Sequence, residues 1–144
     1  MKKCLSLVLV LALCLSLCAC ISNADKETMI AKAHEYINGQ AYKASFTSST
    51  NKLSYTFYFA EDGTVVWLEG IKNDKRDDVV EVTIVEMSFR VESKDEVFID
   101  LVGASGSHKS VKVLFEDGEP HGVMAEFSRS WYSATRCTNT FLNG

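Results

Sequence analysis

Hydrophobic and polar residues alternate at every second position through much of the chain after residue 40, which is typical of half-buried β-strands. One predicted strand carries on a single face Leu53, Tyr55, Phe57 and Phe59. Residues 61–64 then fit a tight hairpin turn, and the chain returns through Val65 and Trp67. Three later strand faces are Val97/Ile99/Leu101, Val111/Val113/Phe115 and Val123/Ala125/Phe127. Their short connections predict antiparallel neighbours.

The run 79–91 changes phase in its middle. Hydrophobic residues fall at 80, 82 and 84 and then at 85, 87, 89 and 91. One regular strand cannot bury both sets on one face, so we predict a β-bulge at Ile84 and Val85 that bends the sheet. The alternative is a segment that passes from one side of the sheet to the other.

A helical pattern precedes the strands. Between residues 25 and 38 the apolar side chains recur at three- and four-residue spacing, as Met29, Ile30, Ala33 and Ile37. Ser22 or Asn23 can cap the start of this helix, and Gly39 can adopt the left-handed conformation that ends it. The predicted fold is therefore mainly β with one N-terminal helix (α+β), in which an antiparallel meander forms a curved sheet or an up-and-down barrel.

The helix end at 37–42 and the aromatic strand and turn at 55–65 resemble the small lipocalin-like domains of bacterial lipoproteins. That resemblance implies an up-and-down β-barrel. Many lipocalins carry Gly-x-Trp in the first strand, whereas this chain has Ala41 where the Trp would stand. A cystatin-like or NTF2-like fold, with a curved sheet wrapped around a helix, is the alternative.

The N-terminus indicates export. Lys2 and Lys3 precede an apolar run from Cys4 to Leu17, the pattern of a signal-peptide h-region. This run is shorter than the roughly 20 residues that a membrane-spanning helix needs, which favours a cleaved signal peptide. Retention of the segment as a spanning helix is the alternative. The sequence Leu-Cys-Ala-Cys at 17–20 resembles the lipobox of bacterial lipoproteins.

The lipobox resemblance implies that Cys20 becomes the first mature residue and carries the acyl chains, palmitate among them, that anchor it in a membrane. We then expect a signal peptide at 1–19, a lipidated tether at 20–24 and one domain at 25–144. The expected location is the extracytoplasmic face of the cell membrane, or a periplasm-facing surface in a cell with two membranes.

The net charge and the cysteine content limit the kinds of partner and chemistry that the exported domain can have. The formal net charge of the chain is −4, with 15 basic and 19 acidic residues. Loss of Lys2 and Lys3 with the signal makes it 13 − 19 = −6. An acidic domain argues against nucleic acid as a partner. Cys137 is the one thiol left after cleavage and acylation, and we interpret it as a small, inert hydrophobic residue.

Motifs for catalysis or metal binding are sparse. His34, His108 and His121 lie in separate segments without zinc-like spacing, so we predict no metal site, no cofactor and no enzymatic activity. Residues 103–107 partly match a nucleophile elbow, which makes a hydrolase that uses Ser105 with His108 or His121 a remote hypothesis.

Aromatic residues point to binding. Tyr58 and Phe98 fall on the face opposite the predicted core, and we name Tyr58, Trp67 and Phe98 as candidate ligand-binding residues. The favoured hypothesis is a non-enzymatic lipoprotein that binds a small apolar ligand in its lipocalin-like domain. The alternative is a protein-interaction or inhibitor module with a filled core, which contacts an envelope protein through loops 103–108 and 72–78.

Overall fold

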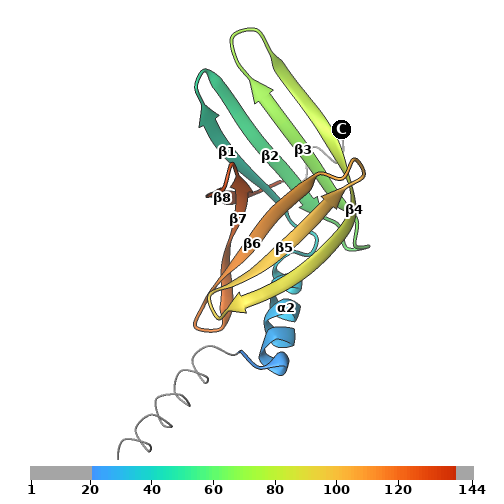
Figure 1. Cartoon of the computed structure of the whole chain (residues 1–144), viewed down its shortest axis with the longest axis vertical. Helices are drawn as coiled ribbons and strands as arrows, with labels where there is room; N and C mark the ends of the chain where they lie inside the picture. The colour runs from blue at the N-terminus through green and yellow to red at the C-terminus, as the bar shows by residue number, and fades with distance from the viewer. Residues whose placement is uncertain (1–20, 139–144) are drawn as a thin grey trace, which may run out of the picture.

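The computed structural model describes residues 21–138, which form one helix and eight antiparallel strands (Figure 1). The elements are α2 (Asn23–Ile37), β1 (Ala41–Ser48), β2 (Asn51–Phe59), β3 (Val65–Lys72), β4 (Asp77–Ser93), β5 (Glu96–Gly103), β6 (His108–Glu116), β7 (Glu119–Phe127) and β8 (Ser130–Cys137). The strands pair in chain order, and β1 pairs with β8, so the meander closes into a barrel. The predicted fold class is confirmed as a closed barrel, and the open sheet wrapped around a helix is not the fold. The predicted signal peptide and Cys20 lie outside the described residues.

The barrel closes at a short seam and bends at one long strand. At the seam, Ala41–Lys43 of β1 pair with Thr135–Cys137 of β8. Strand β4 pairs with β3 over Asp77–Thr83 and with β5 from Ile84 onward. The register shifts between Ile84 and Glu86, which confirms the bulge predicted from the change of phase.

Helix α2 begins two residues earlier than the pattern predicted. The Ser22 hydroxyl accepts a hydrogen bond from the Asp25 amide at 3.1 Å, so Ser22 is the N-cap. At the other end, Gly39 has a φ of 70°, as expected for the residue that ends the helix. Ile21 already packs against the core, which leaves no free tether between Ile21 and the helix.

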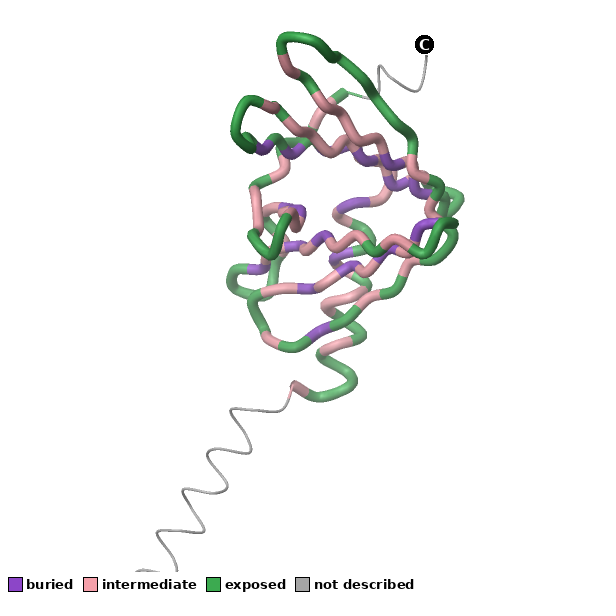
Figure 2. Tube along the Cα trace, turned by 45° about the horizontal axis from the view of Figure 1, so that its top comes forward, coloured by how far each residue is buried: buried purple, intermediate pink, exposed green. Residues whose placement is uncertain are grey.

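The core lies inside the barrel. Figure 2 shows buried positions alternating with more exposed ones along the strands, and exposed residues at the hairpin tips. The alternating faces predicted for β2, β5, β6 and β7 supply much of this core. Its largest fully buried side chains are Trp67, Phe57, Ile37, Ile99, Leu101, Val97, Val111 and Val113.

Candidate binding surfaces

Side chains fill the interior of the barrel. Trp67 and Phe57 have no exposed surface, and their rings stack at a centroid distance of 4.8 Å. Phe46, at the hairpin end, stacks on Phe127 at 4.8 Å and meets the edge of Tyr55 at 4.9 Å. Interiors of this kind bury large aromatic areas at close to crystal-like density. The space that would hold a ligand in a hollow barrel is thus occupied by the chain itself.

Helix α2 covers one end of the barrel. Ala33 and Ile37 are buried there, and the helix packs against β4, β5 and β7. At the same end, Arg136 Nη2 donates to the Tyr42 hydroxyl at 3.4 Å. Burial raises the pKa of Tyr42, and the hydrogen bond from Arg136 opposes that rise. This end is sealed by an apolar helix face, and two tyrosines, Tyr36 and Tyr42, lie beside the Arg136 guanidinium group.

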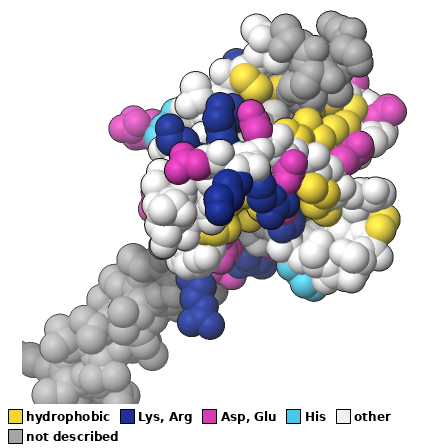
Figure 3. All heavy atoms as spheres, turned by 90° about the horizontal axis from the view of Figure 1, so that it is seen from above, with side chains coloured by type: hydrophobic (Ala, Val, Ile, Leu, Met, Phe, Trp, Pro, Cys, Tyr) yellow, Lys and Arg dark blue, Asp and Glu magenta, His cyan; other side chains and the backbone are white. Residues whose placement is uncertain are grey.

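A charged pair lies across the opposite end. Lys109 Nζ on β6 lies 2.5 Å from Glu69 Oε1 on β3, and the Trp67 indole donates to the same Glu69 oxygen at 3.2 Å. Burial and, to a lesser extent, the charge of Glu69 raise the pKa of Tyr55 to about 12. Figure 3, which looks onto this end, shows basic, acidic and hydrophobic side chains side by side. A polar and aromatic seal closes the hairpin end.

The three candidate ligand-binding residues do not meet. Trp67 is in the filled interior, whereas Tyr58 is half-buried on the outer face of β2, opposite in register to Ala41 and Val66. Phe98 is half-buried on the outer face of β5, opposite in register to Arg90 and Lys112. Trp67 is therefore a core residue, and Tyr58 and Phe98 lie on different parts of the outer surface, so the three residues do not form one site.

Phe98 belongs to an outer patch that we call the aromatic patch, formed by Arg90, Phe98, Lys112 and Trp131. The Phe98 and Trp131 rings lie 5.8 Å apart between centroids. The Arg90 guanidinium lies 4.4 Å from the Phe98 centroid, and Lys112 Nζ lies 4.4 Å from the Trp131 centroid. Trp131 was not predicted to be a surface residue of this patch, because its strand, β8, was not predicted.

Charged neighbours hold the cations of the aromatic patch in place. Arg90 Nε donates to Asp100 at 3.2 Å and the same guanidinium pairs with Glu92, and these hydrogen bonds raise the pKa of Arg90. Lys112 Nζ lies 3.0 Å from Glu96. The patch is thus an aromatic centre within a ring of paired charges.

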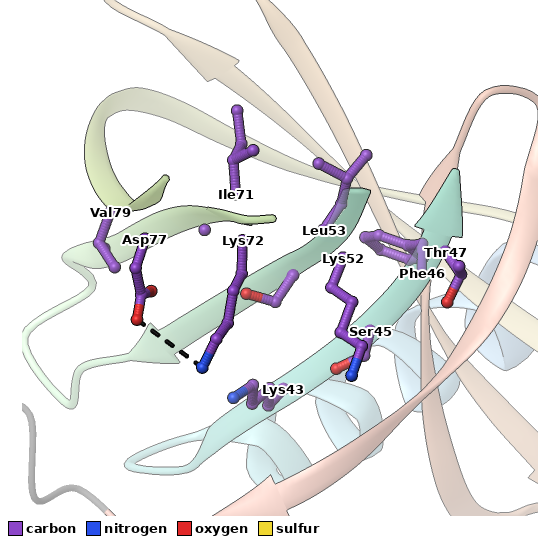
Figure 4. A pocket seen from close by; sticks show the side chains of 12 residues that line it. Lys43, Ser45, Phe46, Thr47, Lys52, Leu53, Ile71, Lys72, Asp77 and Val79 are labelled. Carbon is purple, nitrogen blue, oxygen red and sulfur yellow. Dashed lines mark ion pairs between the residues drawn. The ribbon is translucent and has the colours of Figure 1, made fainter. Parts of the chain in front are cut away.

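A second outer feature is a groove of about 370 Å³ on the face of β1–β4, which we call the lysine groove (Figure 4). Lys43, Lys52 and Lys72 point into it, while Leu53 and Ile71 point to the opposite face of the sheet. The register partners Ser45, Ser54 and Gly70 form its floor. Three neighbouring strands therefore present lysine side chains around a row of small residues. The pattern within any single strand did not predict this groove.

The residues of the hydrolase hypothesis lie in solvent. Ser105 is exposed in the turn after β5, and His108 is exposed at the start of β6. His121 is exposed on β7, a different strand.

The structure also places the Cys137 thiol and bears on metal binding and on membrane-spanning helices. Cys137 is half-buried, and burial raises the pKa of its thiol. In the described part of the chain, no group of three or more His, Cys, Asp or Glu side chains is arranged to hold a metal ion. Among the described residues, no helix has the length and apolar character to span a membrane.

Comparison with known proteins leaves these surfaces as the basis for assigning a function. No protein-family model, no curated protein and no solved structure matches this chain.

Proposed function

We propose that this chain is a lipid-anchored, non-enzymatic envelope protein that works as an interaction module through the outside of a filled barrel. The observation that carries this proposal is the occupied interior, in which Phe57 and Trp67 are fully buried and stacked. Of the two binding hypotheses, a filled core favours the interaction module over a small apolar ligand held inside.

The aromatic patch is the proposed contact surface. Trp and Arg are enriched among the residues that supply most of the binding energy of protein interfaces, Phe is enriched at interfaces generally, and the rim around such a centre is polar. Phe98, Trp131 and Arg90 meet this description, and Lys112 packs on both rings. The proposed partner is an envelope protein that presents an apolar patch with acidic and basic groups at its margin.

The proposed anchor is Cys20, on the strength of the lipobox resemblance at residues 17–20. Helix α2 starts at Asn23 and Ile21 packs against the core, so the acylated residue would adjoin the folded domain directly. The start of α2 and the tips of the β1–β2 and β3–β4 hairpins lie at opposite ends of the molecule (Figure 1). In this proposal the start of α2 faces the membrane and the hairpin tips point away from it.

A site-specific photocrosslinker in living cells of the natural host tests the proposed contact surface. A photoreactive phenylalanine replaces Phe98 or Trp131 in the full-length protein. Tyr58 is the matched control, because it is also a half-buried aromatic residue on the outer wall. We expect the same discrete protein adduct from positions 98 and 131 and none from position 58.

Two results would contradict the interaction module. Adducts of equal yield from all three positions would indicate unspecific contact. A small molecule that co-purifies with the intact protein and leaves only on unfolding, detected by native mass spectrometry, would instead support the internal-ligand hypothesis. Cys20→Ala tests the anchor separately, because it should remove acylation and release the protein from the membrane fraction.

A further inference from the structure

The lysine groove concentrates positive charge on an acidic protein. The whole chain has a formal net charge of −4, yet Lys43, Lys52 and Lys72 line one groove. Within residues 21–138, the one carboxylate within 4 Å of these three ammonium groups is that of Asp77, at 3.8 Å from Lys72 Nζ. That pair is exposed to solvent, with side-chain exposures of 67% and 74%, so it adds little stability, and three ammonium groups face one carboxylate. The groove therefore retains an excess of cations.

Two of these lysines occupy an unfavourable position for folding. Lys52 and Lys72 are directly opposite each other in the register of β2 and β3. Like charges in such a cross-strand pair are destabilising. Local arrangements that oppose stability are expected at functional sites. A bound anion would relieve the repulsion between the two ammonium groups.

The floor of the groove depends on a glycine. A Cβ atom built on Gly70 would lie 2.6 Å from the Ser54 hydroxyl oxygen, which is closer than real side chains approach. Gly70 thus leaves room for the Ser54 hydroxyl above the sheet, beside its register partner Ser45. These two hydroxyl groups can donate hydrogen bonds to a ligand that lies along the groove.

The spacing of the lysines sets the length of the ligand. Lys43 lies four residues along β1 from Thr47, the register partner of Lys52. At the rise of a β-strand, the Lys43 position is about 13 Å from the Lys52–Lys72 row along the sheet. The Ser45–Ser54–Gly70 row lies between these two positions. A single small anion cannot occupy both ends, whereas an extended polyanion can.

We infer that the lysine groove binds an extended, linear polymer of phosphate groups. Lysine acts on phosphate as a point charge that does not fix the orientation of the anion, whereas arginine imposes a planar, bidentate geometry on carboxylates and phosphates alike. The polar residues that line the groove are three lysines, the hydroxyl residues Ser45, Thr47 and Ser54, and Asp77; the lining also includes Phe46, Leu53, Ile71 and Val79, and it contains no arginine. Phosphate oxygens accept hydrogen bonds from both kinds of donor. The two cationic ends of the groove, when both bind one polyanion, also strengthen each other's binding through effective concentration.

The position of the groove favours a polymer over the headgroups of the anchoring membrane. The groove extends toward the tips of the β1–β2 and β3–β4 hairpins, which lie at the end of the molecule opposite the start of α2 (Figure 1). This step rests on the proposed anchor at Cys20, which places the start of α2 at the membrane. The phosphate chemistry of the groove does not depend on that anchor.

Calorimetric titration of the full-length protein in a non-ionic detergent tests the inference. The probes are short-chain inorganic polyphosphate, orthophosphate and hexaglutamate. We expect polyphosphate to bind about tenfold or more tighter than either of the other two, because it alone supplies phosphates to both ends of the groove. Lys43→Gln, Lys52→Gln and Lys72→Gln combined should weaken polyphosphate binding about tenfold or more, as expected for the loss of both ends.

Lys94→Gln is the control for a single lost charge, because Lys94 lies in the turn between β4 and β5 and each of the three groove substitutions also removes one positive charge. It should alter affinity less than about twofold, as expected for a distant charge screened by solvent. Gly70→Ala should weaken binding with no change in charge, because the new Cβ displaces the Ser54 hydroxyl.

Several outcomes would overturn the inference. These are no measurable binding of polyphosphate, an equal loss of affinity in Lys94→Gln, or orthophosphate bound as tightly as polyphosphate. Hexaglutamate bound as tightly as polyphosphate would assign the groove to acidic peptides instead. The lysine variants should keep or slightly raise the melting temperature, because they remove repulsion. Since crosslinking at Phe98 and Trp131 reports on a different wall of the barrel, the two proposals can fail separately.

Discussion

The two ends of the barrel are closed by different chemistry. Helix α2 seals one end with the buried side chains of Ala33 and Ile37. At the hairpin end, Lys109 and Glu69 pair above Tyr55 and Trp67. An apolar seal depends on the removal of surface from water, whereas a charged seal depends on protonation and on both partners being present. The stability of the two ends should therefore respond differently to mutation, pH and salt.

The largest expected effect concerns the helix end. Ile37→Ala removes a side chain that is 1% exposed, so it should lower the free energy of unfolding by about 2–5 kcal/mol. Denaturant titration of the purified protein measures this loss. The control is Val79→Ala at the hairpin end, because Val79 is 65% exposed and its truncation should cost less than about 0.5 kcal/mol. Equal losses in the two variants would show that the helix does not seal the barrel.

The charged seal should show a smaller effect that depends on its partner. Lys109→Met leaves Glu69 partly buried without its cation, so we expect a loss of about 1–3 kcal/mol. Adding Glu69→Gln to this variant should restore part of the loss, because it removes the unpaired charge. A double-mutant cycle from denaturant titrations measures this coupling. Strictly additive losses would contradict the charged seal.

Alkaline pH should affect the two ends unequally. The pKa of Tyr55 is raised from 10.0 to about 12, so the folded protein holds this proton more tightly than the unfolded chain. The resulting stabilisation is complete below pH 10 and is lost as the pH rises from 10 to 12. Tyr55→Phe should therefore flatten the decline of stability in this range.

Tyr42 provides the comparison for the alkaline experiment. Its pKa is also raised by burial, but its hydrogen bond from Arg136 opposes the rise, whereas Glu69 adds to that of Tyr55. Thermal unfolding as a function of pH should thus change less in Tyr42→Phe than in Tyr55→Phe. A larger flattening in Tyr42→Phe would reverse the proposed contrast between the ends.

The smallest effect is expected at the margin of the helix end. Lys32 Nζ lies 2.7 Å from Glu119 Oε1, and the two side chains are 37% and 70% exposed. Glu119→Gln should cost about 0.2–1 kcal/mol at low salt, because solvent screens an exposed pair. The difference from the natural protein should vanish in molar salt, as thermal unfolding can show. A loss that persists in high salt would indicate a role other than charge pairing.

The alternation of hydrophobic and polar residues was sufficient to predict the buried faces of most strands, because one face of each strand contacts the core and the other faces solvent. The bulge at Ile84 could also be predicted, because a change of parity in the hydrophobic positions of one strand has few structural explanations. The first and last strands were not assigned individually. Strand β8 begins at Ser130 and places the polar residues Ser133 and Thr135 between its apolar ones, and it becomes a strand through its pairing with β1 and β7.

The candidate surfaces were less predictable than the fold. Phe98 could be assigned to the outer wall from the parity of its neighbours, but its contact with Trp131 depends on a distant strand. The lysine groove combines residues of β1, β2 and β3, and a local window gave no sign that Lys43, Lys52 and Lys72 share it. The sequence also suggested Trp67 as a ligand residue, because aromatic content alone does not say whether a barrel is hollow or filled.

The seam between β1 and β8 has a consequence for the order of folding. Each of the other strand pairings joins neighbours along the chain, so the hairpins can form one after another from local contacts. The pairing of Ala41–Lys43 with Thr135–Cys137 joins the two ends of the sheet and requires the largest loop closure. Closure must wait for the last strand, and among residues 21–138 three register pairs then join β1 to β8. Amide hydrogens at this seam should therefore exchange with solvent sooner than those of the central hairpins, through openings that leave the rest of the sheet intact.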